Sequence, residues 1–166
     1  LWFNAGVNYA KAGDVQGTIR AYSFVVKSFP KFEQANLVVL DLAKIFERQL
    51  DFVSAVRLYR KYARSYAKKT KEIAGAQAKV CELTMALNAK KAEASCLTFA
   101  SKFPAGGTSV VERLVMQAGR EGRISDMVRL IRTNLLPMIS SDGSLQIKYL
   151  YQIYRKGKGG VRGTAI

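Results

Sequence analysis

The sequence has no histidine, only three prolines and two cysteines, and 12 acidic residues against 27 basic ones. Histidine is the commonest general acid or base near neutral pH and the usual partner of Ser and Cys nucleophiles, so its absence argues against an enzyme. No apolar run approaches the about 18 residues that a membrane-spanning helix needs. With 49% hydrophobic residues and so few prolines, the composition favours a packed and mostly helical domain.

The two cysteines and a glycine-rich segment offer little chemistry. Cys81 and Cys96 lack a zinc-binding spacing, and no histidine can complete a ligand set. We place them on opposite faces of a helical hairpin, where they need not form a disulfide. The segment Gly157-Lys158-Gly159-Gly160 lacks the G-x₄-G-K-[ST] spacing of a phosphate-binding loop. We therefore expect no catalytic residue, no metal and no cofactor.

Large aromatic and small residues follow a fixed spacing near the start of the chain. The pattern W-x₂-A-G-x₂-Y, then T-x₃-Y, then P, is formed by Trp2, Ala5, Gly6, Tyr9, Thr18, Tyr22 and Pro30. We expect two antiparallel helices that approach closely at Gly6, with the aromatic rings filling the space between them. Pro30 ends the second helix. Such a pair cannot bury its apolar face alone, so the pattern predicts further stacked pairs.

Further copies of this pattern follow along the chain and diverge progressively. A shift of 37 residues, applied once and then twice, finds the second and third copies, and a shift of 109 residues finds the fourth. The aligned residues are Tyr9 with Phe46, Asp14 with Asp51, Tyr22 with Tyr59, Ser28-Phe29-Pro30 with Lys102-Phe103-Pro104, and Gly13 with Gly122. The chain is therefore expected to be an array of helical hairpins.

Over residues 1–137 this spacing resembles that of tetratricopeptide repeat (TPR) proteins. The resemblance implies an all-α fold, a right-handed superhelical solenoid of about four hairpins, closed by a C-terminal capping helix. The phrases F-P-K-F-E-Q-A and G-D-x₃-T-I-R-A-Y are similar to those of bacterial cell-envelope TPR proteins. The compartment stays open between the cell envelope and the cytoplasm.

The predicted repeat domain covers residues 1–156. Its repeats span about 1–30, 33–67, 71–104 and 108–137, its helices lie near 1–12, 15–28, 33–49, 52–66, 71–87, 90–102, 108–121 and 124–136, and a capping helix spans 144–155. We expect Gly106-Gly107-Thr108-Ser109 to separate the last two repeats, Ser144 to cap the final helix, and 157–166 to be a flexible basic tail. Since the chain starts without Met at the first aromatic residue of a repeat, we expect it to be part of a longer polypeptide.

The charge of +15 is concentrated beyond residue 50. A basic stripe recurs at helical spacing on the second helix of the second repeat, and its members are Arg57, Arg60, Lys61, Arg64 and Lys68. Such stripes are often solvated surface, but this one has almost no acidic neighbours and could equally steer an anionic partner. The stripe alone does not choose among an acidic protein, an anionic lipid surface and a nucleic acid.

The TPR resemblance also implies a concave binding face, built from the first helix of each repeat. Carried onto this sequence, the face consists of Phe3, Val7, Lys11, Leu40, Lys44, Arg48, Gln77, Cys81, Thr84, Glu112, Met116 and Arg120. Its mixture of apolar and cationic residues suits a segment with acidic side chains. Phe3 could equally pack against a preceding repeat.

Three hypotheses of function remain at this point. The leading one is a non-enzymatic scaffold that binds an acidic segment of a partner protein in the concave groove. The alternative is binding to nucleic acid or an anionic surface through the basic stripe and the tail residues Arg155, Lys156, Lys158 and Arg162. The third is self-association through the open N-terminal end.

Overall fold

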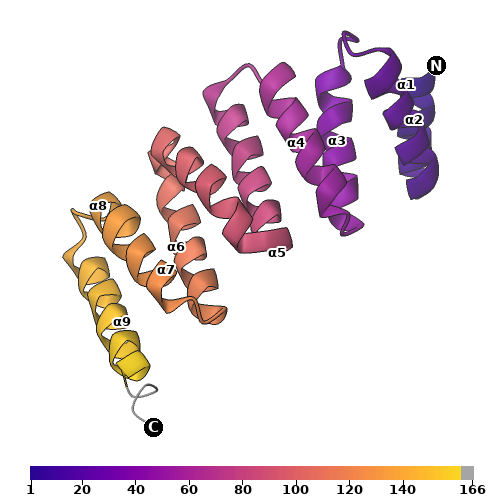
Figure 1. Cartoon of the computed structure of the whole chain (residues 1–166). Helices are drawn as coiled ribbons and strands as arrows, with labels where there is room; N and C mark the ends of the chain where they lie inside the picture. The colour runs from indigo at the N-terminus through magenta and orange to yellow at the C-terminus, as the bar shows by residue number, and fades with distance from the viewer. Residues whose placement is uncertain (162–166) are drawn as a thin grey trace. The chain divides into compact units, whose positions relative to one another are not determined.

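The protein consists of helices. The computed structural model describes residues 1–161, with the backbone alone at residues 89, 105 and 157–161 (Figure 1). The elements are α1 (Trp2–Lys11), α2 (Val15–Ser28), α3 (Ala35–Arg48), α4 (Phe52–Ser65), α5 (Thr70–Lys102), α6 (Pro104–Arg120), α7 (Ile124–Leu130), a π-helical turn η1 (Ile131–Leu135), α8 (Leu136–Met138) and α9 (Gly143–Val161). No strand occurs in this described part of the chain, and the expected all-α class is confirmed.

The chain divides into two compact units, Leu1–Leu87 and a second that begins at Asn88. The division falls inside α5, whose backbone becomes extended at Asn88 with φ −165° and ψ 100°. The Asn88 side chain accepts a hydrogen bond of 2.9 Å from the N–H of Lys91, which caps the second segment of α5. The break agrees with the expected boundary between helices near 71–87 and 90–102.

The same type of turn joins α1 to α2, α3 to α4, and α6 to α7. At Gly13, Leu50 and Gly122 the backbone adopts a positive φ of 73°, 60° and 71°, in the left-handed region that glycine tolerates best. In each turn the next residue donates a 2.9 Å hydrogen bond to the carbonyl five residues back, namely Asp14 to Tyr9, Asp51 to Phe46, and Arg123 to Ala118. This shared geometry confirms the alignment of Gly13 with Gly122.

Aspartates begin the second helix of the first two pairs. Asp14 accepts from the N–H of Gly17 at 2.7 Å and Asp51 from the N–H of Ser54 at 3.0 Å. These bonds satisfy N–H groups that a helix start leaves unpaired. Local sequence therefore fixes where α2 and α4 begin.

Within the first pair, α1 lies directly against α2 at Gly6. A Cβ atom added to Gly6 would lie 2.3 Å from the ring of Tyr22, which is itself 6% exposed. The close approach expected at Gly6 is therefore confirmed. The expectation that Trp2 fills the space between the helices is wrong. Its side chain is 50% exposed and packs against Phe24, with ring centroids 4.6 Å apart.

One apolar core runs through the first unit from α2 to the first segment of α5. Its members include the aromatic residues Tyr22, Tyr59 and Tyr62 and the aliphatic residues Val38 and Leu42, while Phe46 packs against it partly buried. Tyr22 and Tyr59 occupy equivalent positions in their helical pairs, as the 37-residue shift predicts. The core holds α4 in place.

The second unit differs from expectation at its glycine-rich segment. The helix α6 begins at Pro104, so Gly106-Gly107-Thr108-Ser109 lies inside a helix and does not separate two repeats. A Cβ atom at Gly107 would lie 2.4 Å from the carbonyl oxygen of Ala100. This glycine therefore serves close packing of α6 on the second segment of α5, which explains why a turn was the wrong prediction.

The last helix, α9, packs on its own unit through Tyr149. This side chain is 4% exposed, and its hydroxyl donates a 2.7 Å hydrogen bond to Glu112 of α6. Two expectations need correction here. Asp142, not Ser144, accepts from the N–H of Leu145. The helix also continues to Val161, through the first part of the expected flexible tail, while residues 162–166 lie outside the described residues.

Two remaining expectations concern the thiols and the membrane. Both cysteines are disulfide-bonded and neither is a free thiol, which corrects the expectation that they need not be bonded. Among residues 1–161, no helix combines the length and the apolar character that crossing a bilayer requires.

Candidate functional site: a cationic groove

A groove of about 610 Å³ opens between α4 and the first segment of α5. Its lining residues are Val53, Val56, Arg57, Arg60, Lys61, Arg64, Ser65, Thr84 and Leu87. Four of the five predicted stripe residues thus meet one residue of the predicted concave face, Thr84. Lys68 lies beyond the end of α4 and does not line the groove.

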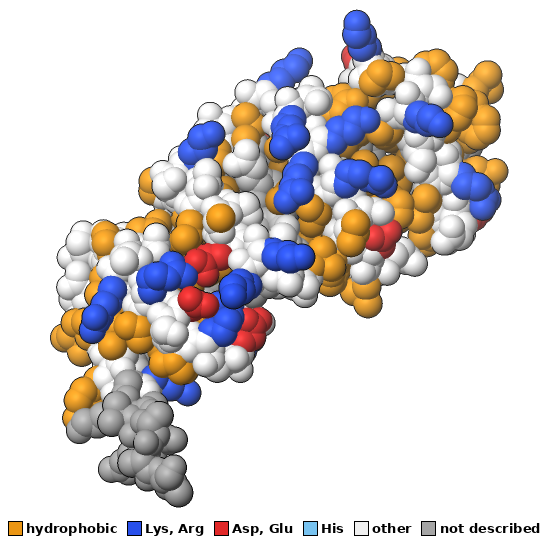
Figure 2. Space-filling view, viewed as in Figure 1, with side chains coloured by type: hydrophobic (Ala, Val, Ile, Leu, Met, Phe, Trp, Pro, Cys, Tyr) orange, Lys and Arg blue, Asp and Glu red, His pale blue; other side chains and the backbone are white. Residues whose placement is uncertain are grey.

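The cations of the groove have no carboxylate among them. Arg57, Arg60 and Arg64 are exposed, and within residues 1–161 none of the three has a hydrogen bond or ion pair. The pKa of Asp51 is lowered mainly by its hydrogen bonds with Ser54, and the charge of Arg57 adds to this effect. Lys61 donates to the backbone carbonyl of Val26 at 3.3 Å, which ties it to α2. Figure 2 shows many Lys and Arg side chains and few acidic ones on the face over α3 and α4. This groove is therefore a concentrated positive site.

Apolar side chains form the rest of the groove. Val56 is 7% exposed, whereas Val53 at its edge is 67% exposed and Leu87 is 48% exposed. The Thr84 hydroxyl donates to the carbonyl of Val80 at 2.6 Å and adds no charge. A ligand in the groove would meet both guanidinium groups and hydrocarbon.

A polar junction centred on Glu47 holds the helices around the groove. The Tyr59 hydroxyl and the Lys79 ammonium each approach Glu47 within 2.7 Å, joining α3, α4 and α5. Burial raises the pKa of Glu47, but the hydrogen bonds from Lys79 and Tyr59 outweigh it and leave that pKa below its ordinary value. Burial and the bond to Glu47 raise the pKa of Tyr59, so its hydroxyl stays protonated. The two helices that form the groove, α4 and the first segment of α5, are thus both bonded to α3 through Glu47.

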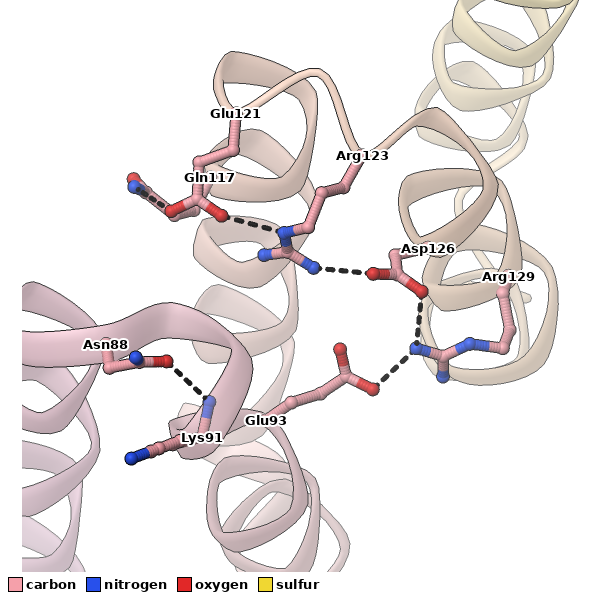
Figure 3. A network of polar contacts seen from close by, with 8 residues as sticks. All are labelled: Asn88, Lys91, Glu93, Gln117, Glu121, Arg123, Asp126 and Arg129. Carbon is pink, nitrogen blue, oxygen red and sulfur yellow. Dashed lines mark hydrogen bonds and ion pairs between the residues drawn. The ribbon is translucent and has the colours of Figure 1, made fainter.

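Cations of the second unit are arranged differently. Arg123 contacts both Glu121 and Asp126 at 2.7 Å, and Arg129 pairs with Glu93 and Asp126 (Figure 3). The bond from Arg123 lowers the pKa of Asp126, although burial slightly opposes it. Asp126 therefore belongs to an ion-pair network that connects α7 with the second segment of α5. These arginines are engaged within the protein.

No family model matches the sequence, and no curated protein matches it. A crystal structure of the MamA protein matches 99% of this chain and 94% of its own, with a TM-score of 0.55 and 16% sequence identity. The fold resembles that of MamA. A second MamA crystal structure matches with a TM-score of 0.53 and 17% identity, over 95% of this chain and 96% of its own. MamA is a TPR-repeat protein, so the expected TPR-like fold is confirmed.

Within each unit of this MamA-like fold, the residues predicted for the concave face lie in different surroundings. Lys44 and Arg48 line a second hollow of about 230 Å³ beside α1 and α2, where Lys44 pairs with Asp41 at 3.5 Å. Phe3 contacts the rings of Tyr22 and Phe32. Val7, Leu40 and Gln77 are half-buried, whereas Lys11, Met116 and Arg120 are exposed.

Two members of that face are buried or contact another helix of their own unit. Cys81 is 2% exposed. Glu112 accepts the hydroxyl of Tyr149 and belongs to the contact between α6 and α9. Of the tail residues, Arg155 and Lys156 are exposed on α9, Lys158 is described by its backbone alone, and Arg162 lies outside the described residues.

Four residues of the groove were not predicted from the sequence, namely Val53, Val56, Ser65 and Leu87. Val53 lies one helical turn before Arg57 and is an apolar residue on the same exposed side of α4. The position of Val53 one turn before Arg57 could therefore have indicated from the sequence that apolar side chains lie beside the cations. Leu87 comes from another helix, and only the packing of α5 against α4 brings it there.

Proposed function

We propose that this protein is a non-enzymatic scaffold whose cationic groove binds an acidic segment of a partner protein. The supporting observation is the set of Arg57, Arg60 and Arg64, exposed side by side over hydrocarbon without a carboxylate partner among the residues described. Unpaired cations at the edge of an apolar groove attract an acidic ligand and select it by charge. A MamA-like, TPR-like fold fits this use, because helical-repeat folds generally serve as binding scaffolds.

The spacing of the cations defines the ligand further. Arg57 and Arg64 are two helical turns apart, about 10 Å along α4. A helical segment with acidic residues at positions i, i+3 or i+4, and i+7 would present carboxylates at the same spacing, and its neighbouring apolar residues could contact Val53 and Leu87. We therefore expect an acidic amphipathic helix in the groove.

The groove is less suited to nucleic acid. Stacking of bases needs exposed aromatic rings. Of the three tyrosines within the stripe, Tyr59 and Tyr62 are only 3% and 8% exposed. Tyr66 is half-buried, and its hydroxyl donates to the carbonyl of Pro30. No aromatic residue is among the side chains that line the groove. The cations alone could hold phosphates, but without base contacts.

The test uses two synthetic helical peptides of identical composition, one with its glutamates on a single stripe and one with them dispersed. We expect the striped peptide to bind at least about tenfold more tightly, because only it matches the row of arginines. The triple variant Arg57→Gln, Arg60→Gln, Arg64→Gln should lose at least about tenfold in affinity for the striped peptide. Isothermal titration calorimetry measures both effects.

The matched control removes three exposed cations of the same unit outside the groove, as Arg20→Gln, Lys27→Gln and Lys31→Gln. It should bind the striped peptide within about twofold of the parent, since long-range attraction is screened by salt. Equal losses in the two triple variants would contradict a specific groove. Tight binding of an oligonucleotide, with a log-log salt slope near −0.9 per duplex phosphate contact and no peptide binding, would favour the nucleic-acid alternative.

A further inference from the structure

The helix α9 has two apolar faces, of which the second unit covers only one. Tyr149 is buried and hydrogen-bonded to Glu112. On the other side, Ile147, Leu150, Tyr151 and Tyr154 are 70%, 51%, 59% and 56% exposed. These four lie at positions i, i+3, i+4 and i+7, so they form one continuous stripe along the helix.

Two cations lie between the apolar faces of α9. Lys148 lies 5.4 Å from the ring centroid of Tyr149 on the buried face, and the guanidinium of Arg155 lies 6.0 Å from that of Tyr151 in the stripe. Lys156 follows on the same helix and is exposed. Between Gly143 and Val161 the sequence has no acidic residue at all. The helix is thus amphipathic, aromatic and positively charged.

We infer that the outer stripe of α9 docks this protein on an anionic lipid surface. An amphipathic helix with Lys and Arg beside its apolar face lies in the plane of the membrane interface, where acyl chains cover the apolar side chains and lipid phosphates attract the cations. Tyrosine is favoured at that depth, because its ring is apolar and its hydroxyl reaches water.

The size and shape of the stripe favour a bilayer over a protein partner. From Ile147 to Tyr154 it extends about 10 Å and presents a single row of side chains. A stable protein interface buries roughly 800 Å² on each partner, more than four partly exposed side chains supply, and a partner helix fits best into a groove between rows. A lipid surface needs no such groove, and a short stripe gives weak and reversible binding to it.

The experiment is sedimentation of the full chain with vesicles of phosphatidylcholine, alone or mixed with phosphatidylglycerol. We expect at least about tenfold more protein on the mixed vesicles at low salt, because the cations require anionic headgroups. The variant Ile147→Asn, Tyr151→Asn should lose at least about tenfold in binding. Removal of each flanking charge, as Lys148→Gln or Arg155→Gln, should cost about fivefold.

Matched controls place the same changes elsewhere on the surface. Leu37→Asn with Leu50→Asn replaces two side chains that are 54% and 74% exposed in the first unit, and Arg20→Gln with Lys27→Gln replaces two exposed cations. These variants should sediment like the parent. All of the substituted side chains are exposed, and unchanged circular dichroism will confirm that the variants are folded.

A second measurement reports insertion directly. The chain has one tryptophan, so a Trp2→Phe, Tyr151→Trp variant carries a single probe on α9. Its emission should shift to the blue on anionic vesicles and stay unchanged on neutral ones.

Several results would overturn the inference. Equal sedimentation with neutral and anionic vesicles, or full binding by the Ile147→Asn, Tyr151→Asn variant, would exclude α9 as the docking element. Vesicle binding that disappears instead in the triple arginine variant of the groove would assign the anion site to α4. Binding of an acidic helical peptide that depends on Ile147 and Tyr151, without vesicle binding, would assign the stripe to a protein partner. The peptide assay on the groove is independent of all these outcomes.

Discussion

Three arginines on α4 of the first unit make no ion pair among residues 1–161, whereas two arginines of the second unit, Arg123 and Arg129, are paired with carboxylates. On α4, Arg57, Arg60 and Arg64 face a groove and have no carboxylate partner in the described chain. On α6 to α7, Arg123 and Arg129 meet Glu121, Asp126 and Glu93. Figure 2 shows the same contrast, with blue side chains mostly alone over α4 and mixed with red ones over α6 and α7. Basic residues therefore have two kinds of surroundings in this molecule: in one unit they line the groove proposed to bind an acidic ligand, and in the other they form ion pairs within the protein.

The units also differ in how their helices are held together. The first unit places tyrosine rings between helices, with Tyr22 against Gly6 and Tyr59 bonded to Glu47. The largest fully buried side chains of the second unit are aliphatic, among them Leu114, Leu130, Ile131 and Leu135. Aromatic packing and the half-buried carboxylate of Glu47 should make the first unit sensitive to single substitutions at those points.

The largest effect is expected at Gly6. In a Gly6→Ala variant the added Cβ atom would lie 2.3 Å from the ring of Tyr22, so α1 or the ring must move. We expect a loss of about 2–3 kcal/mol in the free energy of unfolding, measured by urea denaturation. Gly75→Ala is the matched control, because nothing lies within 4 Å of its added Cβ, and it should stabilise the helix by about 0.5–1 kcal/mol.

The double variant Gly6→Ala, Tyr22→Val extends this test. Removal of the ring removes the clash, so the two substitutions should cost less together than the sum of their separate effects. Strict additivity would mean that Gly6 and Tyr22 do not act on one another.

The sequence predicts this contact because Gly6 and Tyr22 belong to one spaced motif, and motif spacing encodes packing within a helical pair. It fails at Gly107, where glycine serves close packing inside α6 and a turn was expected. It also fails at Trp2, which is half-exposed against Phe24. Both predictions failed for the same reason. The residue type limits which structural roles a residue can have, but the residues packed around it determine which role it takes.

The groove was predictable to a similar extent. Helical spacing on α4 placed Arg57, Arg60 and Arg64 on one side from the sequence alone. The hollow depends on Thr84 and Leu87 of the next helix, whose angle to α4 is set by the buried core and by the Glu47 junction. No local sequence pattern encodes that angle. The basic stripe could therefore be predicted from the sequence, whereas the groove could not.

The second prediction concerns the Glu47 junction. Glu47→Gln keeps an acceptor for the Tyr59 hydroxyl but removes the charge that faces Lys79, and we expect a loss of about 1 kcal/mol in unfolding free energy at neutral pH. Because the pKa of Glu47 is lowered in the folded state, its charge contributes stability above the ordinary value of 4.5 and loses that contribution as the pH falls through the lower folded value.

The difference in stability between parent and Glu47→Gln should therefore shrink below pH 4.5. Urea denaturation at a series of pH values measures this convergence. Asp126→Asn is the comparison in the second unit, where the pKa is also lowered but the side chain is somewhat more exposed, 33% against 25% for Glu47, and its pH-dependent difference should be smaller. A constant difference across the acid range would show that Glu47 acts through packing and not through its charge.

The smallest effect on stability is expected when the arginines of the groove, or those of the ion-pair network, are replaced by glutamine. This comparison tests most directly whether each set stabilises the protein. Arg57→Gln, Arg60→Gln, Arg64→Gln removes no hydrogen bond or ion pair within the described protein. It relieves mutual repulsion and removes only the weak attraction between Arg57 and Asp51, so the melting temperature should change little. Arg123→Gln, Arg129→Gln breaks contacts to three carboxylates and should lower it by about 2 °C. Thermal melts at low and high salt measure both, and salt should narrow the difference because it screens exposed ion pairs. A loss of stability in the groove variant as large as in the network variant would mean that the arginines of α4 are structural, and the contrast between the two units would disappear.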